Sequence, residues 1–178
     1  DVTGSTLLFG SGEEIANKIR NDIKRELGLT ISVGVSFNKV FAKLGSDLKK
    51  PDAVTVITKQ NFKEKLWNLP IGDLLFVGKN TALKLNSIGI KTIGDITLCD
   101  DATLTRILGK NGVQIKSYAN GEDNSPVAPL NQNTKPKSIG KSITCATDFT
   151  EPQEVWKQFI IFAENIADTL RQNSLYAL

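Results

Sequence analysis

The alternation of residues over TISVGVS, residues 30–36, limits the fold more than any other feature of the chain. Apolar Ile31, Val33 and Val35 alternate with Thr, Ser and Gly, so one face of the predicted strand is apolar and the other carries only small side chains. A face this bare lets something large, such as another backbone, approach closely. The pattern predicts a short buried strand with a close neighbour on its small-residue face.

A helix is predicted from about Asn38, because the apolar residues now recur with a helical period. Its core stripe consists of Val40, Phe41, Leu44 and Leu48. Lys39, Lys43 and Lys50 fall on the opposite side. Exposed lysines usually form a solvated surface. The stripe therefore has two interpretations: a solvated helix face, or a phosphate-binding edge beside the strand.

Residues 36–51, SFNKVFAKLGSDLKKP, carry many fixed residues at fixed spacings. The stretch resembles the signature S-x-N-K-x-x-A-K-x-x-S-D-x-x-K-P in the palm of the Y-family (translesion) DNA polymerases. The resemblance implies that Lys50, the lysine before proline, lies near the triphosphate of the incoming deoxynucleoside triphosphate. The other candidates for nucleotide or phosphate binding are Ser36, Asn38, Lys39 and Lys43.

The composition of the chain limits the number of domains and the classes of function that it can have. The chain has 178 residues, of which 40% are hydrophobic and 23% charged, as expected for one or two ordinary globular domains. A net charge of +3 permits nucleic-acid binding without requiring it. The absence of histidine excludes histidine-based acid–base chemistry and histidine metal ligands. Cys99 and Cys145 lie far apart, which favours a reducing cytoplasm over a disulfide framework. No apolar run approaches the ~20 residues that span a bilayer, so no membrane segment is expected.

The first ten residues, DVTGSTLLFG, suggest a strand entered midway. In the resembling family this is the end of the motif S-x-D-E-A-x-L-D-V-T-G-S, and Asp1 matches its last Asp. The resemblance implies that the metal-binding Asp-Glu pair would precede residue 1. Because methionine is also absent, we expect a fragment that holds no bound cofactor and does not polymerise DNA by itself, whereas the parent protein uses Mg²⁺.

Further elements are expected along the first part of the chain. Residues 13–27 predict an amphipathic helix, since Ile or Leu recurs every four residues and Gly28 follows as a stop. Residues 53–57 predict a second short strand, and residues 59–67 a helix that closes this region.

From residue 69 onward, short helical pieces are punctuated by glycine. Two such turns, Val77-Gly78-Lys79 and Gly109-Lys110-Asn111-Gly112, predict helix–hairpin–helix units like those of the family's small helical thumb. Glycine turns leave backbone N–H groups exposed at a helix N-terminus, where they can bind a DNA phosphate without reading bases. The alternative is that these glycines only cap helices in a bundle. The flanking helices are expected over residues 71–75, 81–87, 102–108 and 113–120.

The first turn departs from the family pattern, because Phe76 stands where relatives commonly have glycine. A phenylalanine does not adopt a positive φ without cost. We therefore expect either a different turn geometry or a Phe76 side chain that packs inward.

Residues 124–137 have no periodicity and suggest a linker, in which Lys135 and Lys137 are further DNA-binding candidates. A strand is predicted over residues 137–147, followed by a helix capped by Thr150 with Gln153. The helix has a wide apolar stripe: Val155, Trp156, Phe159, Ile160, Phe162, Ala163, Ile166, Ala167 and Leu170. Residues 175–178 suggest a strand cut short. This order resembles the first half of the family's little finger.

The predicted fold class is α+β: a partial palm sheet with packed helices (residues 1–67), a helical thumb (68–123), a linker (124–136) and an incomplete α+β little-finger segment (137–178). The resemblance implies a segment of an error-prone translesion polymerase, a nucleotidyltransferase that binds primer–template DNA. It also implies a cytoplasmic, nucleoid-associated location and a sliding clamp bound through a missing C-terminus. Self-association through the truncated C-terminal segment is a further expectation. The alternatives are a non-catalytic helix–hairpin–helix DNA-binding protein and an unrelated α+β protein.

Overall fold

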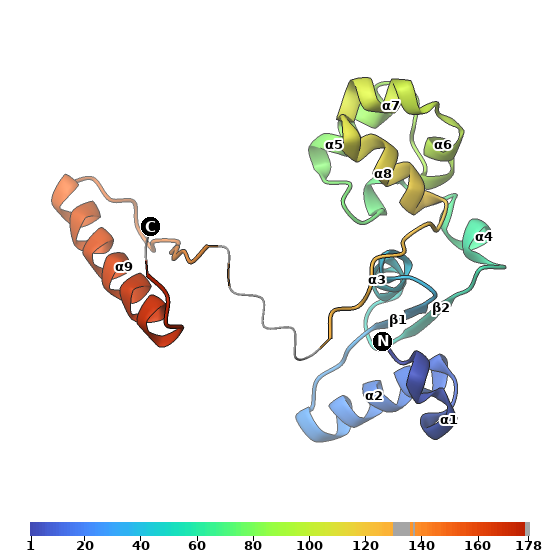
Figure 1. Ribbon diagram of the computed structural model, residues 1–178, viewed down its shortest axis with the longest axis horizontal. Coiled ribbons are helices and arrows are strands. Elements are labelled where there is room, and N and C mark those ends of the chain that lie inside the picture. The colour runs from blue at the N-terminus through green and yellow to red at the C-terminus, as the bar shows by residue number, and fades with distance from the viewer. Residues whose placement is uncertain (130–135, 137, 177–178) are drawn as a thin grey trace. The chain divides into compact units, whose positions relative to one another are not determined.

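The structure, a computed structural model, describes residues 1–129, 136 and 138–176. It divides into two units, Asp1–Val127 and Ala128–Leu178, each of which is described by itself. The elements of the first unit, whose α-helices and strands are labelled in Figure 1, are η1 (Thr3–Ser5), α1 (Thr6–Phe9), α2 (Gly12–Leu27), β1 (Val33–Ser36), α3 (Lys39–Leu48), β2 (Val54–Ile57), α4 (Phe62–Leu66), η2 (Ile71–Asp73), α5 (Lys79–Asn86), α6 (Ile93–Leu98), α7 (Asp101–Leu108) and α8 (Lys110–Ala119).

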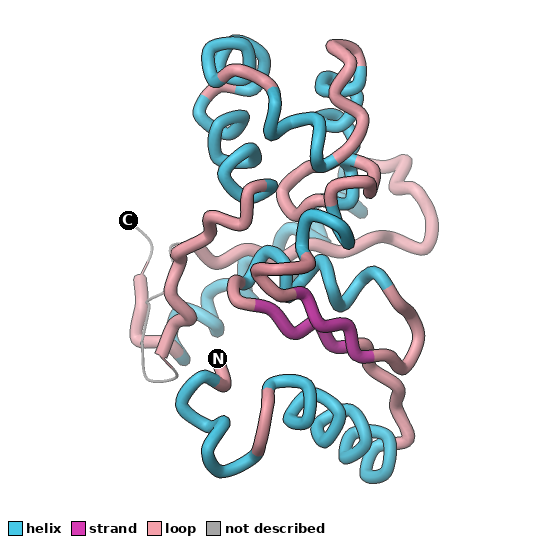
Figure 2. The backbone as a smooth tube through the Cα atoms, turned by 90° about the vertical axis from the view of Figure 1, so that its right-hand side faces the viewer, coloured by secondary structure: helices cyan, strands magenta, loops and turns pink. Residues whose placement is uncertain are grey.

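The sheet consists of β1 and β2, which pair in parallel with Val33 opposite Val54 and Ser36 opposite Ile57. Helix α3 makes the connection between them. Residues 34 and 35 face opposite sides of β1: Gly34 lies against α3, and Val35 lies against the start of α2. The two strands, magenta in Figure 2, are thus covered by a helix on each face. The α+β class is confirmed.

The small-residue face of β1 is filled by the backbone of α3, as the alternation predicted. A Cβ atom added to Gly34 would lie 1.8 Å from the carbonyl oxygen of Ala42 and 2.6 Å from the amide nitrogen of Ser46. On the helix side, a Cβ on Gly45 would lie 3.3 Å from the Cα of Gly34. The strand itself is shorter than predicted, because only residues 33–36 pair with β2.

Helix α2 confirms the predicted amphipathic helix and begins one residue earlier. Ser11 and Glu14 form a capping box at its start, and Gly28 ends it with φ +66°. Helix α4 is shorter than the predicted helix, since residues 58–61 form a hydrogen-bonded turn before it.

The prediction of a strand at the N-terminus was wrong. Residues 3–9 form η1 and α1 instead, and Leu7 and Leu8 are 98% and 81% exposed. A strand needs a neighbour to satisfy its backbone groups, and the only strand paired with β1 in the described residues is β2. A short helix satisfies its hydrogen bonds locally, as in the bond from the Gly10 amide to the Thr6 carbonyl.

One hydrophobic core runs through the first unit. It contains Phe41 of α3, Ile57 of β2 and Leu66 of α4, together with Leu85 and Leu104 of the helical part formed by α5–α8. The predicted palm and thumb therefore share a continuous interior, and the boundary at residue 67 stays a prediction.

The second unit contains α9 (Pro152–Gln172), and the start of this helix corrects the predicted cap. The N-cap is Glu151, not Thr150, and Glu154 completes the capping box in place of Gln153. Pro152 at the first helical position explains the shift. Proline is favoured at that position and holds the residue before it in an extended conformation.

The strand predicted over residues 137–147 is also absent from the described residues of this unit, which are irregular there. The same holds for Leu175 and Tyr176, and residues 177–178 lie outside the described chain. The described residues of this unit contain no strand with which these segments could pair.

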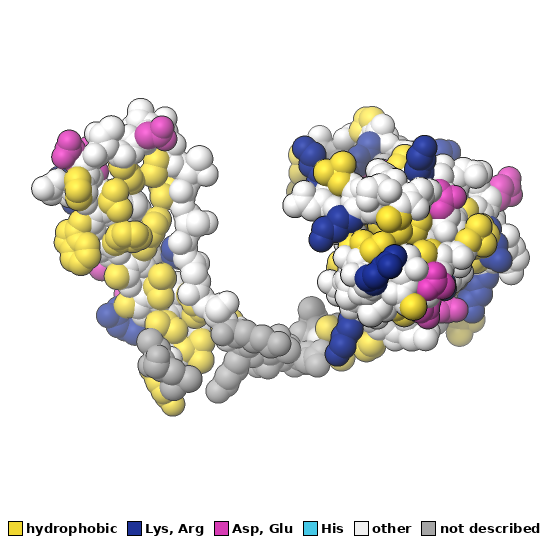
Figure 3. Space-filling view, turned by 90° about the horizontal axis from the view of Figure 1, so that it is seen from above, with side chains coloured by type: hydrophobic (Ala, Val, Ile, Leu, Met, Phe, Trp, Pro, Cys, Tyr) yellow, Lys and Arg dark blue, Asp and Glu magenta, His cyan; other side chains and the backbone are white. Residues whose placement is uncertain are grey.

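The apolar stripe of α9 is exposed in part and half-buried in the rest. Trp156, Phe159 and Ile160 are 66%, 57% and 45% exposed, and no residue of the helix is buried. Figure 3 shows hydrophobic side chains, in yellow, gathered on the face of this unit that is turned toward the viewer. Self-association through this surface stays a prediction. None of the helices in the described part of the chain combines the length and the apolar character that a membrane span requires.

Gly34→Ala should destabilise the first unit by about 3 kcal/mol, because a methyl group cannot fit between two backbones that already touch. Urea unfolding followed by Trp67 fluorescence would measure the change, with Trp156 replaced by Phe so that only the first unit reports. Gly4→Ala is the matched control, since nothing lies within 4 Å of its added Cβ. Equal stability of the two variants would contradict the close approach.

Candidate nucleotide and DNA contact residues

Asn38 begins α3 and uses both ends of its side-chain amide inside the protein. Its Oδ1 accepts a hydrogen bond from the Phe41 backbone N–H at 2.8 Å and so caps the helix. Its Nδ2 donates to the carbonyl oxygen of Gly121 at 3.0 Å. The structure thus places this predicted nucleotide contact between α3 and the end of the helical part.

The predicted lysine stripe of α3 is divided between two partners. Lys39 Nζ donates to the carbonyl oxygen of Pro126 at 2.9 Å. Lys43 Nζ and Lys50 Nζ both bind the carboxylate of Asp47, at 2.8 and 2.7 Å. Lys43 and Lys50 therefore converge on one anion, whereas Lys39 points to the chain that follows α8.

The two ammonium groups lower the pKa of the Asp47 carboxylate that they share. Hydrogen bonds from Lys43 and then from Lys50 hold the pKa of Asp47 below its ordinary value. Because the folded-state pKa is lowered, these ion pairs are present at neutral pH and are lost as the pH falls through the pKa of Asp47. All three side chains are solvent-accessible, so a competing anion can reach the lysines.

Ser36 lies at the carboxyl end of β1, beside the start of α3. Its Oγ is buried and has no hydrogen-bond partner among the described residues. Together with Asn38 and Lys39 it lines a cavity of ≈540 Å³, which residues 123–127 also border. Sequence reasoning missed the part played by residues 124–127, because the composition of residues 124–137 suggests only a linker.

The first thumb turn corrects both alternatives offered for Phe76. Phe76 adopts φ +72° and is 65% exposed, so it neither avoids the left-handed conformation nor packs inward. Its ring packs on Tyr118 of α8 with 5.4 Å between ring centroids. Gly78 has φ −73° and is the N-cap of α5. Because glycine has no side chain to accept a hydrogen bond, the first backbone N–H groups of α5, including that of Lys79, have no side-chain acceptor from the N-cap.

The second thumb turn is tighter than predicted. Gly109, with φ +63°, makes the turn alone, because Lys110 and Gly112 already belong to the first turn of α8. Gly112 is buried, and a Cβ added to it would lie 2.6 Å from the carbonyl oxygen of Leu104. Its amide donates to the carbonyl of Gly109. The glycine at 112 therefore serves the packing of α8 on α7, and the exposed Lys110 is the candidate that faces solvent.

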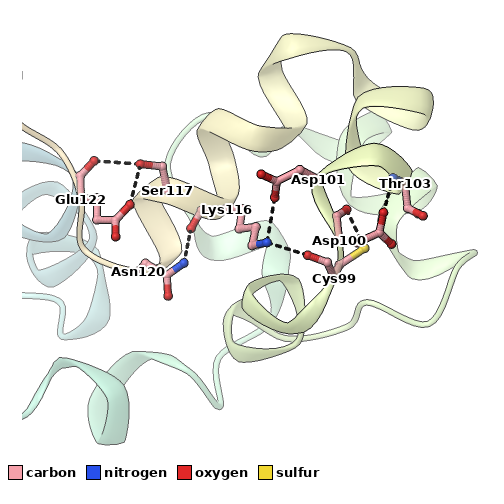
Figure 4. Close-up of polar contacts among 8 residues, drawn as sticks. All are labelled: Cys99, Asp100, Asp101, Thr103, Lys116, Ser117, Asn120 and Glu122. Carbon is pink, nitrogen blue, oxygen red and sulfur yellow. Dashed lines mark hydrogen bonds and ion pairs between the residues drawn. The ribbon is translucent and has the colours of Figure 1, made fainter.

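A polar network that sequence reasoning missed joins α8 to the start of α7 (Figure 4). Lys116 Nζ donates to the carbonyl oxygen of Cys99 and to Asp101 Oδ1, both at 2.8 Å. Asp100 caps α7 by accepting from the Thr103 amide at 2.8 Å, and this bond is the main cause of its lowered pKa. These contacts fix the directions of the two helices whose ends meet at Gly109.

Two groups of predictions are not reached by the structure. Lys135 and Lys137 lie outside the described residues. For a metal ion, the described part of the chain contains no cluster of three or more His, Cys, Asp or Glu side chains that could hold one. The described residues therefore do not fit a metal centre, and no catalytic step through a metal is assigned to them.

Comparison with known proteins connects this geometry to a family. Residues 1–47 match the impB/mucB/samB family. The DNA polymerase IV of Acetivibrio thermocellus is 54% identical over 175 residues, which are 98% of this chain and 44% of that protein. The DNA polymerase IV of Clostridium kluyveri is 40% identical over 97% of this chain and 43% of its own length.

Solved structures agree with the sequence matches. A Y-family DNA polymerase chimera superposes with a TM-score of 0.66 at 32% identity, over 72% of this chain and 38% of that one. The chain is related to the Y-family DNA polymerases. A post-insertion binary complex of Dbh DNA polymerase has a TM-score of 0.64 at 31% identity, over 71% of this chain and 38% of that one. The resemblance seen in residues 36–51 is confirmed, and an unrelated α+β protein is excluded. The chain spans less than half the length of these Y-family relatives.

Phe76→Gly should be more stable than Phe76→Ala by about 1 kcal/mol, because glycine adopts a positive φ without the steric cost that alanine retains. Both variants lose the ring contact with Tyr118. The difference between their free energies of unfolding therefore measures the cost of the positive φ at residue 76. Chemical denaturation of the two proteins would measure it. The control pair is Lys84→Gly and Lys84→Ala within α5, where the order should reverse. The same order at both positions would contradict the strain at Phe76.

Proposed function

We propose that this chain forms part of the nucleotide-binding palm and the DNA-binding thumb of a Y-family polymerase. The complete polymerase would carry out template-directed nucleotidyl transfer across damaged bases. The observation that carries the proposal is the convergence of Lys43 and Lys50 on one carboxylate at the end of α3. The relation to Y-family polymerases supports it.

The nucleotide side of the proposal rests on charge. Asp47 brings the two ammonium groups within 2.8 Å of one carboxylate. Phosphate oxygens bind such groups by the same charge-assisted hydrogen bonds. A triphosphate would therefore compete with Asp47 for Lys43 and Lys50, and Lys50 would be the lysine nearest to it.

The DNA side rests on the two helix starts of the thumb. Unlike α6 and α7, which begin with the side-chain caps Thr92 and Asp100, α5 and α8 begin at glycines without such caps. Their first backbone N–H groups can bind phosphates. Lys79 and Lys110 are exposed beside them and add positive charge. Contacts of this kind hold the sugar–phosphate backbone and carry no sequence preference.

The remaining expectations concern the complete polymerase and its partners. For the complete polymerase we propose Mg²⁺ as the metal, held by carboxylates outside this chain, so the chain alone would bind DNA without extending a primer. The rival is a non-catalytic DNA-binding role, which primer extension by the complete protein would exclude. Clamp binding, self-association through α9 and a nucleoid-associated location stay predictions.

The chain should bind duplex DNA regardless of sequence, with an affinity that falls steeply as salt rises, because each neutralised phosphate releases counterions. Lys110→Gln should lower the slope of log K against log salt by about one. Fluorescence anisotropy with a labelled duplex would measure both. Lys18→Gln, an exposed lysine on α2, is the matched control and should leave the slope unchanged. Tight binding that is insensitive to salt would contradict phosphate contacts.

In the complete polymerase, Lys50→Ala should raise the KM for the incoming nucleotide roughly tenfold, since a charge-assisted hydrogen bond to phosphate is lost. Asp47→Asn should lower that KM, because the competing carboxylate charge is removed. Steady-state single-nucleotide insertion would measure both, with Lys49→Ala as the control at the same helix end. An unchanged KM in both test variants would overturn the role given to Lys50.

A further inference from the structure

The segment that leaves α8, residues 121–127, is held by two side chains from the start of α3. We call it the exit segment. Asn38 Nδ2 donates to the Gly121 carbonyl at 3.0 Å, and Lys39 Nζ donates to the Pro126 carbonyl at 2.9 Å. The two bonds bridge 83 and 87 residues of sequence. Two residues that are neighbours in sequence thus hydrogen-bond to carbonyl groups at the start and near the end of the exit segment.

The packing at Gly121 shows that this approach is built into the fold. Gly121 has φ +81°, and a Cβ added to it would lie 3.1 Å from Phe41 Cε2 and 3.3 Å from Phe37 Cζ. Any other residue would meet both the conformational cost and the two rings. Glycine is therefore the favoured residue where the chain passes over the aromatic side chains at the start of α3.

A third side chain holds the same end of α8. Trp67, which follows α4, donates its indole Nε1–H to the Ala119 carbonyl at 3.1 Å. Asn38 and Trp67 thus bind carbonyl groups two residues apart, from separate elements. The last carbonyls of a helix have no partner within the helix, so these bonds determine where α8 ends against the rest of the unit.

We propose that Asn38 and Lys39 are positioning residues: they anchor the exit segment and so set the placement of the helical part α5–α8 relative to α3. In this arrangement neither side chain is a primary nucleotide contact. Of the lysines on the stripe, Lys43 and Lys50 remain for phosphate. The consequence for DNA binding rests on the proposed function, whereas the anchor itself can be measured without DNA.

The two roles of Asn38 can be separated by one substitution. In Asn38→Asp, the ionised carboxylate still accepts the Phe41 amide and so keeps the helix cap. A carboxylate has no N–H to donate, so this variant loses the bond to the Gly121 carbonyl. Asn38→Ala loses both bonds. The pair therefore distinguishes an anchor from a cap.

Amide hydrogen exchange by NMR on this chain tests the anchor. The amides of Asn120, Gly121 and Glu122 close the end of α8. In Asn38→Asp they should exchange about fivefold faster, the effect of one lost hydrogen bond on local opening. The Phe41 amide should keep its protection in Asn38→Asp and lose it in Asn38→Ala. Unchanged exchange at residues 120–122 in Asn38→Asp would overturn the anchor.

Lys39→Met gives a second test that leaves the cap and Asn38 intact. It should lower the ¹⁵N heteronuclear NOE of Val127, because the Pro126 carbonyl is released, whereas Lys49→Met should not. In duplex-DNA titrations the slope of log K against log salt should stay at the wild-type value in Lys39→Met. A slope lower by about one would show a phosphate contact instead and overturn the positioning role. Failure of the wild-type chain to bind DNA would overturn only the proposed function, since exchange and NOE are measured without DNA.

Discussion

The contact between the backbones of β1 and α3 is the interaction on which the rest of the first unit depends. Gly34 leaves no side chain between the strand and the helix, so α3 lies on the sheet at a distance that tolerates no shift. This fixes the start of α3 at the carboxyl end of β1. Asn38 then reaches the end of α8, and Lys43 and Lys50 meet at Asp47 near the other end of the helix.

Features determined by neighbouring residues were predicted from the sequence. The bare face of β1 and the apolar stripe of α3 follow from local periodicity. The stop of α2 at Gly28 follows from the freedom of glycine to adopt a positive φ. The lysines of α3 could be placed on one side of the helix for the same reason. Such patterns report which face of an element is buried without naming the element that buries it.

Features that depend on distant residues were not predicted. The tie from Asn38 to Gly121 joins two stretches whose local patterns contain no sign of each other. Phe76 accepts an unfavourable φ because the chain on both sides of it is held by η2 and α5, and its ring contacts Tyr118. The strand expected over residues 137–147 is absent from the described residues there, because the described part of its unit has no strand to pair with it.

The long bonds at the end of α8 bear on how the first unit forms during synthesis. Asn38 and Trp67 are made long before their acceptors at Gly121 and Ala119, which follow 83 and 52 residues later. Until those acceptors leave the ribosome, the aromatic side chains at the start of α3 lack the glycine that packs over them. Because non-local contacts carry a loop-closure cost before they stabilise anything, the packing at the start of α3 is completed only after α8 has been synthesised.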